Sequence, residues 1–307
     1  MTFFGHPTGR LSDGRLAIDF IAEALGLPLL SPSLATNQRF QQGANFAVAG
    51  ATALNRTFFM QDGDLAVTPY NISLSEQLGW FDAMKPACEE YFSKALFFVG
   101  EFGWNDYGFM LLAGKSVDEI HPHTPKVVGM ISAATEKANQ GRRQDDRRLG
   151  ALTNGVRRRE PCSFWGAKQI RLRAQHGLPQ ESEPGIQSRE HNLRLRRELK
   201  QLNDTHPDVR IIYADFYSPI VDFVVSPGRY GFNGTDGGLR CCCGGGGGRY
   251  NFNTSTVCGA PGSSACRDPS AYVNWDGIHL TEAASRRIAD GWLKGPYAHP
   301  PILSACN

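Results

Sequence analysis

The stretch A-L-F-F-V-G at residues 95–100 decides the fold class of this chain. It is a short apolar run that ends at a glycine, and the more polar stretch E-F-G-W-N-D-Y follows it at residues 101–107. An uninterrupted apolar run of this length is typical of a strand in a parallel sheet, because such strands are covered on both faces. The run therefore predicts a buried parallel strand with a loop at its carboxyl end.

Helical patterns and a further strand flank this run. Apolar residues at helical spacing predict helices, and short β-branched runs predict strands. The predicted helices cover residues 16–25, 75–93, 126–139, 191–202 and 281–292, and the predicted strands cover 95–100 and 209–214, with a small-residue strand and turn at 44–54. This alternation predicts an α/β fold with a parallel sheet between helical layers, in which ligands bind at the carboxyl ends of the strands.

Composition narrows the class of protein. The 307 residues carry a net charge of +2 with 20% charged residues, which does not favour a dedicated nucleic-acid-binding protein. No apolar run is long enough for a membrane span, and residues 1–10 lack the layout of a signal peptide. Eight cysteines are nevertheless typical of a secreted protein with disulfides. Five N-x-S/T sequons agree with a glycoprotein, at Asn55, Asn71, Asn203, Asn233 and Asn253.

A candidate acid-base pair lies near the end of the chain. The stretch N-W-D-G-I-H-L-T-E-A-A at residues 274–284 places Asp276 and His279 three residues apart. A carboxylate can hold an imidazole in one tautomer while the other ring nitrogen takes a proton from an attacking hydroxyl, as in a catalytic triad. The alternative is structural, since Asp276 can also cap or solvate the turn before the helix predicted at 281–292. This stretch alone leaves both interpretations open.

Two residues at predicted strand ends are candidates for binding an oxyanion. The amide of Asn105, in the loop after the strand at 95–100, can donate to a negatively charged oxygen, and Gly50 can offer a backbone N–H at close approach. Asn105 can equally be a turn residue, and Gly50 can be a packing glycine.

These places, together with the four longer blocks that contain or accompany them, resemble the plant GDSL esterase/lipase family, a branch of the SGNH hydrolases. The blocks are F-F-G-H-P-T-G-R-L-S-D-G-R at residues 3–15, G-A-N-F-A-V-A-G-A at 43–51, V-G-E-F-G-W-N-D at 99–106 and, as a loop, R-C-C-C-G-G-G-G-G-R-Y-N-F-N at 240–253. The resemblance implies a single flavodoxin-like three-layer α/β/α sandwich over residues 1–307. For the cysteine-rich loop at 240–253, the resemblance allows disulfide bonds to Cys258 or Cys266.

The resemblance also implies roles for the candidate residues. In such a hydrolase of carboxylic esters, His279 is the general base, Asp276 orients it, and Gly50 and Asn105 complete the oxyanion hole. No metal or cofactor is implied. The implied substrate is a small-molecule or lipid ester, and the implied location is extracellular. The oligomeric state is left open.

The nucleophile that this mechanism needs has no counterpart in the 307 residues. The family's Gly-Asp-Ser block precedes the block at residues 3–15 by a few tens of residues. Ser12 matches a family position that follows the glycine-arginine element, Gly9-Arg10, and is not the attacking serine. No G-x-S-x-G elbow provides a substitute. We therefore expect an N-terminally truncated chain without the first strand of the sheet, inactive by itself. The alternative is a non-catalytic remnant or binding protein of the same fold.

A second departure from the family lies at residues 141–187. Between Arg142 and Arg173, ten basic residues stand against three acidic ones, a balance usually typical of a nucleic-acid arm or a disordered linker. We interpret it as a shift of reading frame or a mis-spliced exon, since permitted codons read one base later can spell A-K-T-I-V-V-S-G and other strings that resemble the family. Because an inner strand cannot bury unpaired arginines without large cost, we expect the segment to loop out of the sheet and to be disordered.

Overall fold

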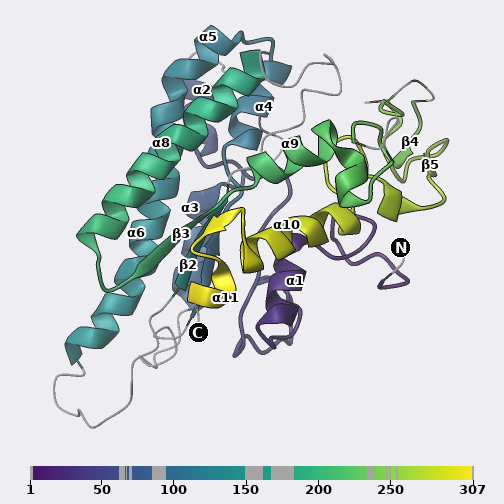
Figure 1. Ribbon diagram of the computed structural model, residues 1–307. Helices are drawn as coiled ribbons and strands as arrows, with labels where there is room; N and C mark the ends of the chain where they lie inside the picture. The colour runs from purple at the N-terminus through teal and green to yellow at the C-terminus, as the bar shows by residue number, and fades with distance from the viewer. Residues whose placement is uncertain are drawn as a thin grey trace. The chain divides into compact units, whose positions relative to one another are not determined.

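The computed structural model describes residues 3–61, 66, 68, 71–84, 95–148, 162–166, 183–233, 238–246, 248, 250–253 and 255–305. The chain divides into two compact units. Unit 1 comprises residues 1–30, 169–182 and 215–297, and unit 2 comprises residues 31–168, 183–214 and 298–307. Figure 1 shows the elements of both units.

Unit 2 is built on a four-stranded sheet. Its strands follow the order β1 (Phe97–Val99), β2 (Cys162–Gly166), β3 (Arg210–Ala214) and β6 (Ala298–His299). The first three are parallel to their neighbours, whereas β6 pairs antiparallel with β3. The strands predicted at residues 95–100 and 209–214 are therefore confirmed, as is a mixed α/β architecture, although the residues of β1 are half-buried and not buried as predicted. The complete three-layer sandwich and the single domain stay predictions.

The unusual basic segment contributes β2, the strand between β1 and β3. The expectation that this segment loops out of the sheet is wrong at Cys162–Gly166, which pairs with both neighbours. The physical reason is local composition: C-S-F-W-G carries no charge, so an inner position here requires no buried arginine. Residues 141–148 continue helix α6 and residues 183–187 belong to helix α8, and the expected disorder at 149–161 and 167–182 lies outside the described residues.

Two long helices form a layer beside this sheet. They are α6 (Thr124–Arg148) and α8 (Glu183–Thr205), which lie side by side in Figure 1. Gln187 donates to Thr124 near their starts, and His206 bonds Glu136 further along, so the two helices run in the same direction. Both helices predicted from periodicity, at 126–139 and 191–202, are confirmed and are longer than predicted.

The core of unit 2 lies where these helices meet the shorter ones. Val127, Val128 and Ile131 of α6 pack with Leu195 and Leu199 of α8. The remaining helical elements of this unit are α2 (Arg56–Gln61), α3 (Leu74–Met84), α4 (Trp104–Leu112), α5 (Val117–Ile120), η2 (His121–His123) and α11 (Ile302–Ala305). The helix predicted at 75–93 is confirmed over α3, and its second half falls outside the described residues.

The strand and turn predicted at residues 44–54 are only partly present. The segment forms isolated bridges, Asn45 with Pro32 and Thr52 with Ser73, and no continuous strand. Small residues and glycines give a strand little side-chain surface to pack, so this segment follows turns instead. Its end is held by Asp106 of α4, whose carboxylate accepts the backbone N–H groups of Ala53 and Leu54.

Unit 1 contains α1 (Ala17–Ala24), α9 (Tyr217–Val225), η3 (Pro227–Tyr230), η4 (Pro269–Ala271), α10 (Glu282–Lys294) and a small hairpin of β4 (Cys243–Gly244) and β5 (Ser264–Ala265). The helices predicted at 16–25 and 281–292 are confirmed as α1 and α10, which pack together. Disulfides Cys242–Cys266 and Cys243–Cys258 confirm that Cys258 and Cys266 are the partners of the cysteine-rich loop.

Candidate active site

Asp276 and His279 form a hydrogen-bonded pair in unit 1. The distance between Asp276 Oδ2 and His279 Nδ1 is 2.6 Å. The other oxygen, Oδ1, accepts the backbone N–H groups of Ile278 at 2.9 Å and of His279 at 2.7 Å. The aspartate therefore closes a tight turn and holds the imidazole at once, so the structural and the catalytic interpretations of this residue are compatible. With Nδ1 at the carboxylate, the lone pair that accepts a proton lies on Nε2 of the neutral ring.

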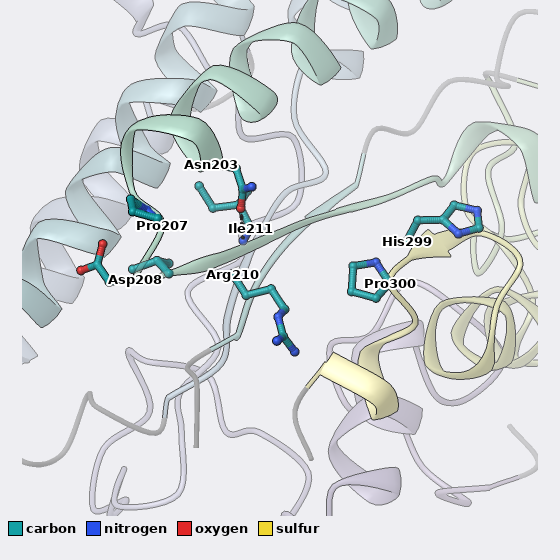
Figure 2. Close-up of a pocket in the computed structure, with 8 residues that line it drawn as sticks. Asn203, Pro207, Asp208, Arg210, Ile211, His299 and Pro300 are labelled. Carbon is teal, nitrogen blue, oxygen red and sulfur yellow. Dashed lines mark hydrogen bonds between the residues drawn. The ribbon is translucent and has the colours of Figure 1, made fainter. Parts of the chain in front are cut away.

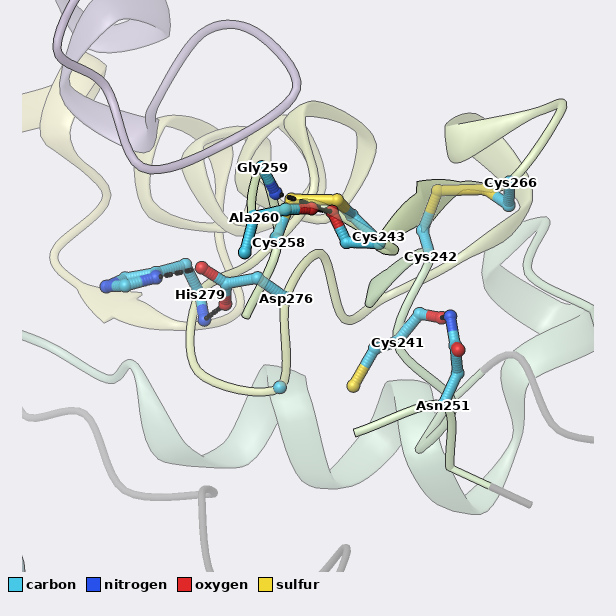
Figure 3. The surroundings of a disulfide bond; sticks show 12 residues. Cys241, Cys242, Cys243, Asn251, Cys258, Gly259, Ala260, Cys266, Asp276 and His279 are labelled. Atoms are coloured by element: carbon cyan, nitrogen blue, oxygen red, sulfur yellow. Dashed lines mark hydrogen bonds and ion pairs between the residues drawn. A yellow bond between two sulfur atoms is a disulfide. The ribbon is translucent and has the colours of Figure 1, made fainter. Parts of the chain in front are cut away.

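The turn that carries this pair is held by the disulfide-bonded loop. The backbone N–H groups of Cys242 and Cys243 donate to the carbonyl oxygens of Asn274 at 2.9 Å and Trp275 at 2.7 Å. Figure 3 shows Asp276 and His279 with Cys241–Cys243 and their disulfide partners. Two disulfides in this loop restrict the backbone that supports the pair, which is the kind of rigid support a catalytic side chain needs.

The environment keeps Asp276 ionised and His279 accessible. Burial by itself would raise the pKa of the Asp276 carboxyl, but the hydrogen bond and charge of His279, with the two backbone N–H groups, lower the pKa below its usual value. The Asp276 side chain is 15% exposed and the His279 side chain is 25% exposed. The imidazole is therefore partly exposed, and the carboxylate that it bonds is more sheltered.

In unit 2, the start of α4, which carries Asn105, contacts the loop that contains Gly50. Asn105 lies in the first turn of α4 and not in the loop after β1 as predicted, because Gly103, at φ +100°, begins the helix at Trp104. Its Nδ2 donates to the carbonyl oxygen of Ala51 at 2.8 Å, directly after Gly50. An amide NH₂ carries two donors, and this bond uses one. Gly50 lies at φ +78°, in the left-handed region where glycine is favoured.

Asp106 is a buried anchor of this contact that sequence reasoning missed. Its two carboxylate oxygens accept the backbone N–H groups of Ala53 and Leu54, each at 2.9 Å, and the residue is 0% exposed. Complete burial raises the pKa of this carboxyl, and the four backbone N–H groups around it lower the pKa by a smaller amount. As a result, the pKa is raised to about 6. Asp106 thus ties the loop that follows Gly50 to the start of the helix that carries Asn105.

Replacing Asp106 with asparagine is expected to change how stability depends on pH. A carboxyl whose pKa is raised to about 6 in the folded state binds a proton that the unfolded state has released. Its contribution is therefore fully present below about pH 4 and is lost as the pH rises through about 6, a change of about 3 kcal/mol for a shift of this size. Urea unfolding between pH 4 and 7.5 should show this slope in the parent protein and not in Asp106→Asn. Parallel curves for the two proteins would contradict the assignment.

Ser12 is a buried, hydrogen-bonded serine. The residue is 4% exposed. Its hydroxyl donates to Asp13 Oδ1 at 3.4 Å and accepts the backbone N–H of Gly14, with 3.5 Å between nitrogen and oxygen. That this serine does not attack the substrate stays a prediction.

One pocket of unit 2 lies beside β3 and β6. It has a volume of about 370 Å³ and is lined by residues that include Asn203, Arg210 and His299 (Figure 2). Arg210 is the first residue of β3, whereas ligands of parallel sheets bind beyond the carboxyl ends of the strands. We do not assign this pocket to the ester site.

The chain matches a known protein family over most of its length. The model of the GDSL-like lipase/acylhydrolase family matches residues 2–292. The chain belongs to this family. The Asp276–His279 pair, Gly50 and Asn105 all lie within the matched region of this GDSL family member.

Named relatives extend the same conclusion. Two GDSL esterase/lipases of Arabidopsis thaliana are 43% and 42% identical to the chain, covering 97% and 99% of it and 82% and 76% of their own lengths. The sinapine esterase of Brassica napus is 39% identical over 99% of the chain and 79% of its own length. The family homologues support ester hydrolysis. Among the described residues, no helix combines the length and the apolar character that crossing a bilayer requires.

Proposed function

We propose that this GDSL family member is a carboxylic ester hydrolase in which His279 is the general base. The Asp276–His279 hydrogen bond carries the proposal, because it fixes the imidazole tautomer whose Nε2 can accept a proton. The serine that attacks the ester comes from a Gly-Asp-Ser block of the family type, which the 307 residues do not contain. This chain alone would then be inactive. The alternative is a non-catalytic remnant or binding protein of the same fold, which would have no need of the serine.

The reaction follows from these roles. His279 removes the proton of the serine hydroxyl as its oxygen bonds to the ester carbonyl carbon, and Asp276 stabilises the imidazolium that forms. The carbonyl oxygen becomes an oxyanion, which accepts hydrogen bonds from the backbone N–H of Gly50 and the amide of Asn105. The imidazolium then protonates the leaving alcohol, and water hydrolyses the acyl-serine by the same steps.

The substrate and the location of the protein are proposed more broadly. A small-molecule or lipid ester is the proposed substrate class, and the name of the Brassica napus relative adds sinapine to the candidates. The two disulfides and the five sequons support a secreted glycoprotein. A secreted enzyme would meet esters outside the cell.

An activity assay on two forms of the chain tests this function. The 307-residue protein should hydrolyse p-nitrophenyl acetate at the background rate, because no nucleophile is present. The same chain extended at its N-terminus by the Gly-Asp-Ser block of a relative should hydrolyse it well above background. Turnover by the 307 residues that survives His279→Ala would reject this assignment, and an inactive, folded extended protein would favour the non-catalytic alternative.

A further inference from the structure

The S-D-G-R stretch at residues 12–15 contacts the first residue of α10. Asp13 Oδ1 accepts the backbone N–H of Glu282 at 2.7 Å. In return, Glu282 Oε2 accepts the backbone N–H of Arg15 at 2.8 Å, and Glu282 Oε1 accepts Nη2 of Arg15 at 2.7 Å. These bonds join positions 267 to 269 residues apart in the sequence. We call the set formed by Asp13, Arg15 and Glu282 the Asp13–Arg15–Glu282 clamp.

The clamp is sheltered and closely fitted. Asp13 is 4% exposed, and the side chains of Arg15 and Glu282 are 14% and 17% exposed. A Cβ atom added to Gly14 would lie 1.7 Å from Glu282 Oε2, so only glycine permits this approach. The N–H of Glu282 is one of the four at the start of a helix that have no partner within it, and Asp13 supplies that partner.

The clamp holds the exit of the loop that carries the Asp276–His279 pair. Thr281, the N-cap of α10, donates its backbone N–H to Val273 at 3.0 Å and its hydroxyl to Tyr272 at 2.6 Å, which closes the loop. Glu282 follows directly, three residues after His279. A movement of the first turn of α10 would therefore pull on His279 through only two intervening residues.

We propose that Asp13 and Arg15 are positioning residues that hold His279 in register with Asp276 by fixing the start of α10. This role rests on the proposed function of His279 as general base. Neither residue touches the reacting atoms. Loss of the clamp lets the first turn of α10 fray, and the imidazole then samples orientations in which Nδ1 leaves the carboxylate.

The test measures the imidazole directly and needs no enzymatic activity. In the 307-residue protein labelled with ¹⁵N-histidine, the proton on Nδ1 of His279 gives a downfield NMR signal that His279→Gln identifies by its loss. In Arg15→Gln and in Glu282→Gln, exchange of this proton with water should be faster by about tenfold or more, since local opening controls exchange. Glu282→Gln keeps the shape of the side chain, so it serves if Arg15→Gln does not fold.

A second ion pair provides the matched control. Arg10 donates to Asp19 of α1 at 2.7 Å, so Arg10→Gln breaks a pair on the same N-terminal segment but at α1 instead of α10. In Arg10→Gln, the Nδ1 proton of His279 should exchange with water at the same rate as in the parent protein. Folded Arg15→Gln and Glu282→Gln proteins with parent-like exchange, or an equal acceleration in Arg10→Gln, would overturn the positioning role. Failure of the proposed function would appear separately, as an inactive extended chain with the Nδ1 signal intact.

Discussion

In the chain extended by a Gly-Asp-Ser block, Asp276→Asn is expected to lower the turnover number by about 10⁴-fold, and His279→Ala by at least as much. The reason is the 2.6 Å bond between Asp276 Oδ2 and His279 Nδ1. An asparagine that offers its NH₂ to this ring favours the wrong tautomer, whose Nε2 carries a hydrogen and cannot accept the serine proton. Steady-state kinetics of the three proteins at one pH measures the effect.

The control for this experiment is a histidine of unit 2. His121 is exposed and bonds Glu190, so His121→Ala removes an imidazole without changing the proposed base. Its turnover number should match the parent. If Asp276→Asn retains most of the activity in a protein that is folded, then the aspartate only caps its turn, as the structural interpretation of the sequence allowed.

Asn105→Ala in the same extended chain is expected to lower the turnover number by about 10²- to 10³-fold, the usual cost of deleting one oxyanion donor. KM should change little, because the bond to the oxyanion strengthens only in the transition state. The variant also loses the 2.8 Å bond to Ala51, which contributes about 1 kcal/mol to stability. Turnover must therefore be measured where the folded fraction is complete.

Thr52→Val is the matched control for Asn105→Ala. Thr52 Oγ1 donates to the carbonyl oxygen of Leu54 at 2.6 Å, within the same loop. Its removal should cost stability of similar size and should leave most of the turnover in place. Equal losses of turnover in Thr52→Val and Asn105→Ala would mean that loop integrity, and not an oxyanion donor, explains the effect.

Much of the fold followed from local patterns, and the misses have physical causes. The apolar runs that form β1 and β3 and the periodic segments of α6 and α8 have strong local signals, so both types of element were predicted. α9 was missed because Y-S-P-I-V-D-F-V-V is rich in β-branched residues that favour strands, and its helix depends on packing, with Phe223 0% exposed. β6 has only two residues, too few for any periodicity.

The candidate site shows the same division between local and distant contacts. The aspartate and histidine are three residues apart, so their bond is a local event that the sequence could indicate. The bonds of Asp106 reach 52 and 53 residues back to Leu54 and Ala53, and an aspartate beside a glycine-rich turn gives no sign of such partners. The clamp spans almost the whole chain and is equally invisible locally. Tertiary structure, not pattern, reveals these positioning residues.

The central claim is that His279 activates a serine supplied by the Gly-Asp-Ser block. The most direct measurement is the rate of covalent labelling by a fluorophosphonate, with the modified residue located by mass spectrometry, in the extended chain and in its His279→Ala variant. We predict one adduct, on the serine of the block, which forms much more slowly in the variant. Labelling of another residue, or labelling of that serine at the same rate without His279, would contradict the account.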